Sequence, residues 1–199
     1  MNLLIEGPYG SATYFPNFLK DYDRILLVAG GIGATFTLPI YRDLLQRISR
    51  DPREEGRLRF VWVVRAEEDA EWGIQTLRTD HGAVPASFEL HISNSPRAHH
   101  RTSSTDGSKD SIELQEREQL LSSSTSSDPS QVALAGIELK TGRPDLKSIV
   151  DDVFSAGAGE KVAVLVCGPR GMGKSLRREV GRWVGRGREV WWHGEEFWW

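Results

Sequence analysis

Three glycines follow an apolar run of strand-forming residues in the first quarter of the chain. The run covers residues 25–29 (Ile-Leu-Leu-Val-Ala), the glycines are Gly30, Gly31 and Gly33, and apolar residues then recur at helical spacing over 40–48. A strand, a glycine turn and a helix in this order direct backbone N–H groups and the positive end of the helix dipole at one point. Because that arrangement binds phosphate groups, the pattern predicts a nucleotide site. Phe stands where the G-x-G-x-x-G pattern requires its last glycine, so a tight turn that binds nothing is the alternative.

A second glycine-rich stretch carries the letters of a phosphate loop. Residues 168–175 (GPRGMGKS) satisfy G-x-x-x-x-G-K-[ST] between a predicted strand and a predicted helix. In such a loop Lys174 would reach the terminal phosphate and Ser175 would hold Mg²⁺. Pro169 removes one backbone donor, however, and no apolar strand ending in Asp follows to complete a metal site. Nucleotide hydrolysis is therefore an alternative and not the first hypothesis.

Size, charge and cysteine content limit the classes of protein to consider. With 199 residues, 39% hydrophobic and 27% charged, the chain is expected to form one globular domain that is soluble by itself. A net charge of −3 argues against a general nucleic-acid binder, and a single cysteine rules out an internal disulfide. We find neither a signal peptide nor a membrane-spanning segment. His99 and His100 are the only adjacent histidines, and we interpret them as solvated loop residues, so no metal site is predicted.

The glycine turn must be held by a sheet, and the hydrophobic pattern predicts a parallel one. Apolar or alternating runs indicate strands at 3–6, 25–29, 57–65, 86–93, 161–167 and 188–193, and apolar stripes indicate helices at 67–78, 144–154 and from Met172 onward. Thr35 or Thr37 is expected to cap the helix after the glycines, with Pro39 in its first turn. Leu176, Val180, Trp183 and Val184 are expected to face inward.

This order of elements predicts an α/β fold with a doubly wound, parallel, five-stranded sheet in the order 3-2-1-4-5 and helices on both faces. The Ser- and Thr-rich segment 95–132 is expected to be a disordered insertion with a short helix near 110–121. In that topology the glycine turn and the Cys167-Gly168-Pro169 turn lie side by side where the winding reverses. The whole chain, 1–199, is treated as one domain, with 1–23 as a junction to a preceding one.

Six short segments, taken in order, give the chain a resemblance to a known family. They are 6–10 (EGPYG), 29–39 (AGGIGATFTLP), 61–65 (VWVVR) with Trp72 after it, 141–144 (TGRP), 167–172 (CGPRGM) and 193–199 (HGEEFWW). Together they resemble the NAD(P)H-binding domain of the fungal ferric-chelate reductases and NADPH oxidases, in the ferredoxin-reductase superfamily. A polar insertion is also common in the fungal members.

The resemblance implies a role for particular residues. The expected cofactor-binding residues are Gly30, Gly31, Ile32, Gly33, Ala34, Thr35, Arg65, Arg143, Cys167, Gly168 and Pro169. Arg65 is the choice for the 2′-phosphate of NADPH, with Arg143 as a helper, although a solvated strand-end arginine is the alternative. Cys167 is the one catalytic candidate, as a packing and orienting residue beside the nicotinamide and not a nucleophile. The expected flavin-facing residues are Gly7, Pro8, Tyr9, Gly10, Phe197 and Trp199.

The resemblance also implies cofactors and partners that this chain does not provide. NADPH would bind here, and its hydride would pass to FAD and then, through haem, to Fe³⁺ or Cu²⁺. The partners would be FAD-binding and haem-bearing membrane domains of the same reductase, at the cytosolic face of a membrane, most simply the plasma membrane. Three alternatives stay open: a superoxide-generating oxidase, the phosphate-loop protein described above, and a non-catalytic fragment.

Overall fold

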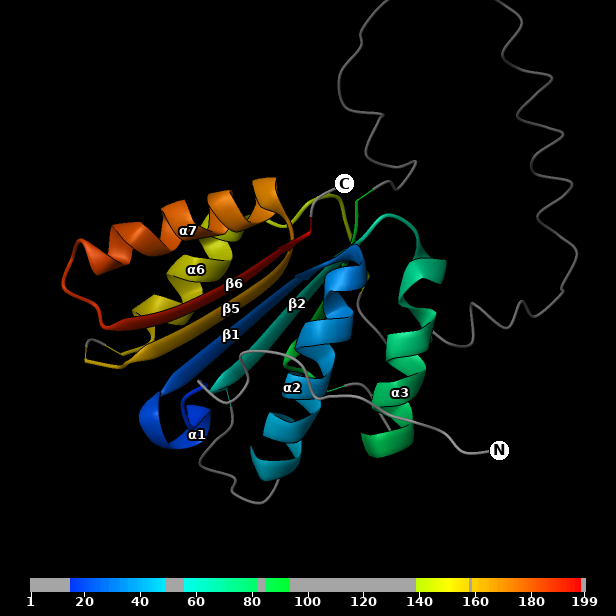
Figure 1. Ribbon diagram of the computed structural model, residues 1–199, viewed down its shortest axis with the longest axis horizontal. Coiled ribbons are helices and arrows are strands. Elements are labelled where there is room, and N and C mark those ends of the chain that lie inside the picture. Colours follow the sequence, from blue (N-terminus) through cyan, green and yellow to red (C-terminus); the bar gives the residue numbers. More distant parts are fainter. Residues whose placement is uncertain (1–14, 49–55, 82–84, 94–138, 158, 198–199) are drawn as a thin grey trace, which may run out of the picture.

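A six-stranded parallel sheet forms the centre of the molecule and carries helices on both faces (Figure 1). The computed structural model describes residues 15–48, 56–81, 85–93, 139–157 and 159–197. The strands are β1 (Arg24–Gly30), β2 (Leu58–Val64), β3 (Phe88–Ile92), β4 (Leu139–Thr141), β5 (Val162–Pro169) and β6 (Val190–Phe197). Their order is β4-β3-β2-β1-β5-β6, and every neighbouring pair is parallel.

The predicted order of the five main strands is confirmed, but the predicted number of strands is wrong. The sixth strand is β4, which pairs with β3 at the edge of the sheet. It has only three residues, and none of them is buried, so it lacks the apolar run by which the other strands were recognised. The last strand is also longer than predicted. It continues to Phe197, because β6 keeps its parallel pairing with β5 as far as Pro169.

One face of the sheet is covered by the helices α2 (Ala34–Ile48) and α3 (Glu71–His81), with α1 (Phe18–Asp21) and the short helix η4 (Glu67–Ala70) beside them (Figure 1). The largest side chains of this core layer, Trp62, Tyr41 and Phe60, are fully buried. Burying each of them contributes about 2–3 kcal/mol, so this layer is a major source of stability.

The start of α2 differs from the prediction. A single 3₁₀ turn, η2 (Gly31–Gly33), leads directly into the helix at Ala34, so neither threonine is its cap. The hydroxyl of Thr35 donates to the carbonyl of Ile32 at 2.8 Å, and that of Thr37 donates to the carbonyl of Gly33 at 3.3 Å. Both bonds run back along the helix, which is how threonines inside a helix behave. Pro39 is accordingly the sixth residue of α2 and not part of its first turn.

The helices α6 (Leu146–Ser155) and α7 (Arg170–Val184) cover the other face of the sheet (Figure 1). The carboxylate of Asp145 accepts from the backbone N–H groups of Lys147 and Ser148, so α6 begins two residues after Pro144. Leu176 and Val180 of α7 are buried as predicted, but Val184 is 50% exposed, so its predicted inward position is wrong. It lies in the last turn of the helix, where the apolar stripe has rotated away from the sheet.

A charged cluster joins the three strands at one edge of the sheet. Glu89 on β3 accepts from Arg59 on β2 at 2.6 Å and from Lys140 on β4 at 2.7 Å. His91 on β3 lies 3.7 Å from the same carboxylate. Together these groups hold the pKa of Glu89 well below its ordinary value. The two direct contacts are within hydrogen-bond distance and that of His91 is not, so we expect the cations to have the larger effect. The cluster holds β4, the shortest strand, in place.

Several predictions fall on residues outside the described ranges. These are the strand at 3–6, the insertion at 95–132 with its helix, and the pair His99 and His100. Within the described ranges, no helix combines the length and the apolar character needed to cross a bilayer. In the same ranges, no three His, Cys, Asp or Glu residues are grouped so that they could hold a metal ion.

Candidate functional site

The glycine turn after β1 and the turn at the end of β5 are in direct contact, as the sequence predicted. Ala29 pairs with Cys167 across the two central strands. A Cβ atom on Gly33 would lie 2.1 Å from the carbonyl oxygen of Cys167, and one on Gly30 would lie 2.6 Å from the ring of Pro169. Neither position has room for any other residue. We call this contact between residues 30–33 and 167–169 the seam.

The seam leaves one glycine open to a ligand. Gly31 has a φ of 53°, in the left-handed region that favours glycine, and a Cβ there would have no neighbour within 4 Å. The indole N–H of Trp62 donates to the carbonyl of Gly31 at 2.9 Å and fixes the peptide. The first N–H groups of a helical segment have no partner within it, so those of η2 are available at this turn, whereas the N–H of Ala34 already donates to the carbonyls of Gly31 and Ile32. The arrangement is suited to bind a phosphate group.

Cys167 is buried at the seam. Burial raises the pKa of its thiol to about 11, and the nearby carboxylate of Glu195 adds to the effect. Glu195 is the partner of Cys167 in the pairing of β5 with β6. At neutral pH the group is therefore a neutral thiol, which is a poor nucleophile. The environment supports the expected packing role and gives no support to covalent catalysis.

The two arginines expected to face the adenosine ribose both lie at the carboxyl ends of the strands. Arg65 directly follows β2, and Arg143 comes two residues after β4 ends. Val64, Ile92 and Thr141 are in register, so only β3 separates the two positions. Both residues are exposed, and the guanidinium of Arg65 makes no ion pair within the described part of the chain. Two cations are thus available for a charged ligand, although the structure does not bring them into contact.

Two further features near the carboxyl end of β2 were not assigned a role from the sequence. Trp72 is 41% exposed, and its ring packs edge-on against Trp62, with 5.5 Å between centroids. An exposed aromatic ring thereby packs on the indole that bonds to Gly31. Glu67, Glu68 and Asp69 are exposed in η4, immediately after Arg65. Trp72 belongs to one of the six segments found in the sequence, but that segment did not indicate that its ring packs on Trp62.

The expected flavin-facing residues are only partly described. Residues 7–10 and Trp199 lie outside the described ranges. Phe197 ends β6 and pairs with Pro169, so its backbone lies next to the seam. The same strand brings His193 and Glu195 together, with 2.9 Å between Nε2 and Oε1. The ring of His193 stacks on Trp191. The sequence did not predict this pair, because the strand was expected to end at His193.

The stretch that resembles a phosphate loop is helical. The strand β5 ends at Pro169 and α7 begins at Arg170, so Lys174 and Ser175 lie inside the second turn of the helix. A phosphate loop needs several residues of loop between strand and helix, whose N–H groups converge on the phosphate. None is left between Pro169 and Arg170. The geometry does not favour nucleotide hydrolysis.

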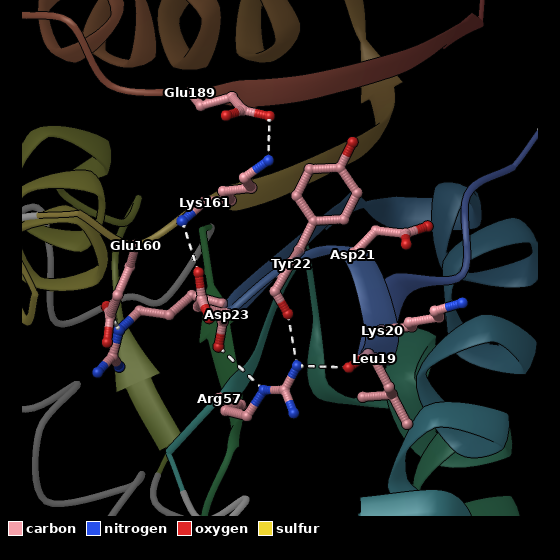
Figure 2. A pocket seen from close by; sticks show the side chains of 10 residues that line it. Leu19, Lys20, Asp21, Tyr22, Asp23, Arg57, Glu160, Lys161 and Glu189 are labelled. Carbon is pink, nitrogen blue, oxygen red and sulfur yellow. Dashed lines mark hydrogen bonds and ion pairs between the residues drawn. The ribbon is translucent and has the colours of Figure 1, made fainter.

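A large polar groove lies at the opposite end of the strands from the seam (Figure 2). It has a volume of about 890 Å³ and is lined by residues 19–24, Arg57, Glu160, Lys161 and Glu189. Its charges pair with one another: Arg24 with Glu160, and Lys161 with Glu189 at 2.8 Å. Arg57 donates to the carbonyls of Asp23 and Leu19. These contacts tie α1 to the strands, and we interpret the groove as structural, since ligands of doubly wound sheets bind at the carboxyl ends of the strands.

A parallel sheet wound in both directions, with a glycine turn and a helix N-terminus where the winding reverses, defines the class of doubly wound nucleotide-binding domains. The chain resembles the solved structure of the cytochrome P450 reductase GcoB from Amycolatopsis. The TM-score is 0.51 at 19% identity, over 96% of this chain and 42% of that one. At this identity the likeness shows the fold alone.

Comparison of sequences identifies the family. The profile described as "Ferric reductase NAD binding domain" matches residues 22–181, so the chain belongs to that family of NAD(P)H-dependent oxidoreductase domains. The chain is 24% identical to the ferric/cupric reductase transmembrane component 2 of Schizosaccharomyces pombe, over 98% of its length and 29% of that protein's. It is 30% identical to the NADPH oxidase 4 of Rattus norvegicus, over 87% of its length and 26% of that protein's. The chain thus spans less than a third of the length of these relatives.

Proposed function

We propose that the chain is the NADPH-binding portion of a membrane metalloreductase or oxidase, and that it presents the nicotinamide for hydride transfer to a flavin. The observation that carries this proposal is the seam. A helix N-terminus suited to a pyrophosphate lies directly against the turn of Cys167, at the edge where this class of fold binds its ligands.

Each part of the dinucleotide has a place along this edge. The pyrophosphate would lie on the N–H groups of residues 31–33, with Ala34 and Thr35 beside it, and the nicotinamide against Cys167, Gly168 and Pro169. The exposed ring of Trp72 offers an apolar surface to the adenine. The neutral thiol of Cys167 would fill space and orient the ring. The nicotinamide supplies the hydride, and the chain's own residues hold it and exclude water.

The choice of NADPH over NADH depends on Arg65, with Arg143 as a helper. A guanidinium with no carboxylate partner suits the dianionic 2′-phosphate. The acidic residues of η4 follow immediately, and their repulsion reduces the preference for the phosphorylated cofactor. We therefore expect a preference of moderate size.

The electron acceptors belong to the parts of the protein beyond this chain. Residues 7–10, Phe197 and Trp199 would face the flavin, with residues 1–23 forming the junction to its domain. FAD would pass electrons to haem-bearing membrane domains and then to Fe³⁺, Cu²⁺ or O₂, and this chain would lie at the cytosolic face of the membrane. The names of the relatives include both metal reductases and oxidases. The acceptor would be chosen by those other domains.

The direct test is cofactor preference after removal of one charge. The Arg65→Ala variant should lose most of its affinity for NADPH and almost none for NADH, because the 2′-phosphate is the only difference between the two. Loss of one charge-assisted contact of about 1.5–3 kcal/mol predicts a roughly 10- to 100-fold drop in the affinity for NADPH. Arg47→Ala, at the far end of α2, is the matched control. An unchanged NADPH/NADH ratio in Arg65→Ala would show that the assignment is wrong.

A further inference from the structure

The outer surface of α7 is almost entirely basic. From Arg170 to Arg186 the exposed positions are Arg170, Gly171, Lys174, Arg177, Arg178, Gly181, Arg182, Val184, Gly185 and Arg186. Six are cations, three are glycines, and none is acidic. We call the six cations the basic face. It is part of a chain whose net charge is −3, so positive charge is concentrated on one side of the molecule.

The acidic groups near the basic face neutralise only part of it. Glu179 is the one acidic residue of α7, is 9% exposed, and is paired with Arg178 and Arg182. Glu196 of β6 lies 3.8 Å from Arg170, and Asp151 of α6 has a weaker influence on Arg182. The remaining cations, Lys174, Arg177 and Arg186, have no carboxylate partner in the described part of the chain. At least three positive charges therefore face outward without compensation.

The shape of this surface fits a flat and extended partner. From Arg170 to Arg182 the cations run along about 18 Å of helix, taking 1.5 Å per residue; Arg186 follows in the turn after α7, and the six do not converge on one point. Gly181 lies between them, and a Cβ there would have no neighbour within 4 Å. Glycine inside a helix costs up to about 1 kcal/mol, and packing does not require it here. Because Gly181 has no side chain, the surface of α7 is lower there than at the long arginines on either side.

Features beside α7 favour a membrane over a nucleic acid. The helix packs against α6, β5 and β6 and does not stand free of the domain, as a helix that reads a duplex groove does. The guanidinium of Arg177 lies 5.9 Å from the ring centroid of Trp192, and that of Arg186 lies 5.0 Å from that of Trp183. Both rings are thereby covered, and bases could not stack on them. Half-exposed Val184 adds an apolar contact at one end.

We infer that the basic face of α7 docks this domain onto a lipid bilayer that carries anionic headgroups. The flat row of cations meets the negative surface, and the glycines allow close approach. Docking fixes the orientation of the domain, with α7 toward the lipid and the α2 and α3 layer away from it. This binding function is separate from nucleotide binding and does not depend on the proposed function.

The test is co-sedimentation of the 199-residue chain with vesicles. One set is phosphatidylcholine alone and the other contains about one third phosphatidylserine. The chain should bind only the anionic vesicles and should dissociate at about 1 M salt, where the screening length is about 3 Å. The triple variant Lys174→Gln, Arg177→Gln and Arg186→Gln should bind on the order of 100-fold more weakly, since each basic residue near the surface contributes about fivefold.

A matched control separates this surface from net charge. Lys20→Gln, Arg42→Gln and Arg47→Gln remove the same charge from α1 and α2, and this variant should bind like the original chain. Thermal melting checks that both variants fold. The inference is wrong if the unaltered chain does not bind anionic vesicles, or if both triple variants lose binding equally. It is also wrong if the basic face binds RNA or polyglutamate and no vesicles.

Discussion

The carbonyl oxygen of Cys167 occupies the position that a side chain on Gly33 would need. A Cβ atom built on Gly33 lies 2.1 Å from that oxygen and 2.6 Å from the carbonyl carbon. These neighbours are backbone atoms of a buried central strand, so they cannot move aside as a flexible side chain would. The glycine therefore brings the N-terminus of α2 against β5, and the seam depends on it.

Replacing this glycine should open the seam. The Gly33→Ala variant is expected to lose about 3 kcal/mol or more in free energy of unfolding, because the backbone of β1 or β5 must shift. Urea unfolding measures the loss, and NADPH binding should fall with it. Gly181→Ala is the control: it adds the same methyl group in open space on α7 and should gain up to about 1 kcal/mol. Equal stability of the two variants would contradict the packing argument.

We expect the indole N–H of Trp62 to affect NADPH binding, in addition to the packing of the indole ring in the core. In Trp62→Phe the carbonyl of Gly31 loses its side-chain donor and keeps the N–H of Ala34, so the glycine turn becomes freer. A hydrogen bond of about 1 kcal/mol predicts NADPH binding that is weaker by about fivefold. Tyr41→Phe is the control, since it removes one hydrogen bond to Ser87 in the same core layer, away from the turn. Isothermal titration of both variants should show the loss only in Trp62→Phe.

Glu89 should give the edge of the sheet a stability that depends on pH. Its pKa in the folded chain is well below the ordinary 4.5, so its contribution is fully present above that value and is lost as pH falls below it. Glu89→Gln should therefore be less stable at pH 7, by roughly 1–3 kcal/mol. The difference should shrink as pH is lowered from about 4.5. Urea unfolding across pH 3–7 measures it, and a difference that grows in acid would refute the interpretation.

The thiol of Cys167 should be unreactive while the chain is folded. Burial and the raised pKa, about 11, leave almost no thiolate at pH 8. Iodoacetamide should modify it only after urea is added, as mass spectrometry would show. Rapid modification of the folded chain would mean that the turn is open or that the thiolate is stabilised. Either result would remove the packing role that we give to this residue.

The main strands and the seam could be predicted because they depend on local and strongly patterned sequence. Residues 25–29 are buried on both faces of the sheet, and this burial appears as an unbroken apolar run. The order of the strands followed from the alternation of strands and helices together with the handedness of the crossovers. The meeting of Gly33 with Cys167 then followed from topology, and not from either motif alone.

The features that could not be predicted depend on partners distant in the sequence. The strand β4 has no apolar pattern of its own and is held by Glu89 and by pairing with β3. The contact of Trp72 with Trp62, whose indole bonds to the glycine turn, depends on the burial of Trp62 in the core. The helix predicted from Met172 begins two residues earlier, at Arg170, directly after the strand, which a motif whose letters fit a loop did not indicate. In each case the structure depends on tertiary contacts that the local sequence does not specify.

The most direct test of the account is to locate the bound dinucleotide on the chain. Backbone amide signals of the 199-residue chain would be followed by nuclear magnetic resonance during titration with NADP⁺, with and without Mg²⁺. We predict that Gly31, Ile32 and Gly168 shift, at the carboxyl ends of the strands, and that Mg²⁺ makes no difference. Shifts confined to Asp23 and Lys161, in the groove at the opposite end, would contradict the account. So would binding of ATP that requires Mg²⁺ and is lost in Lys174→Ala.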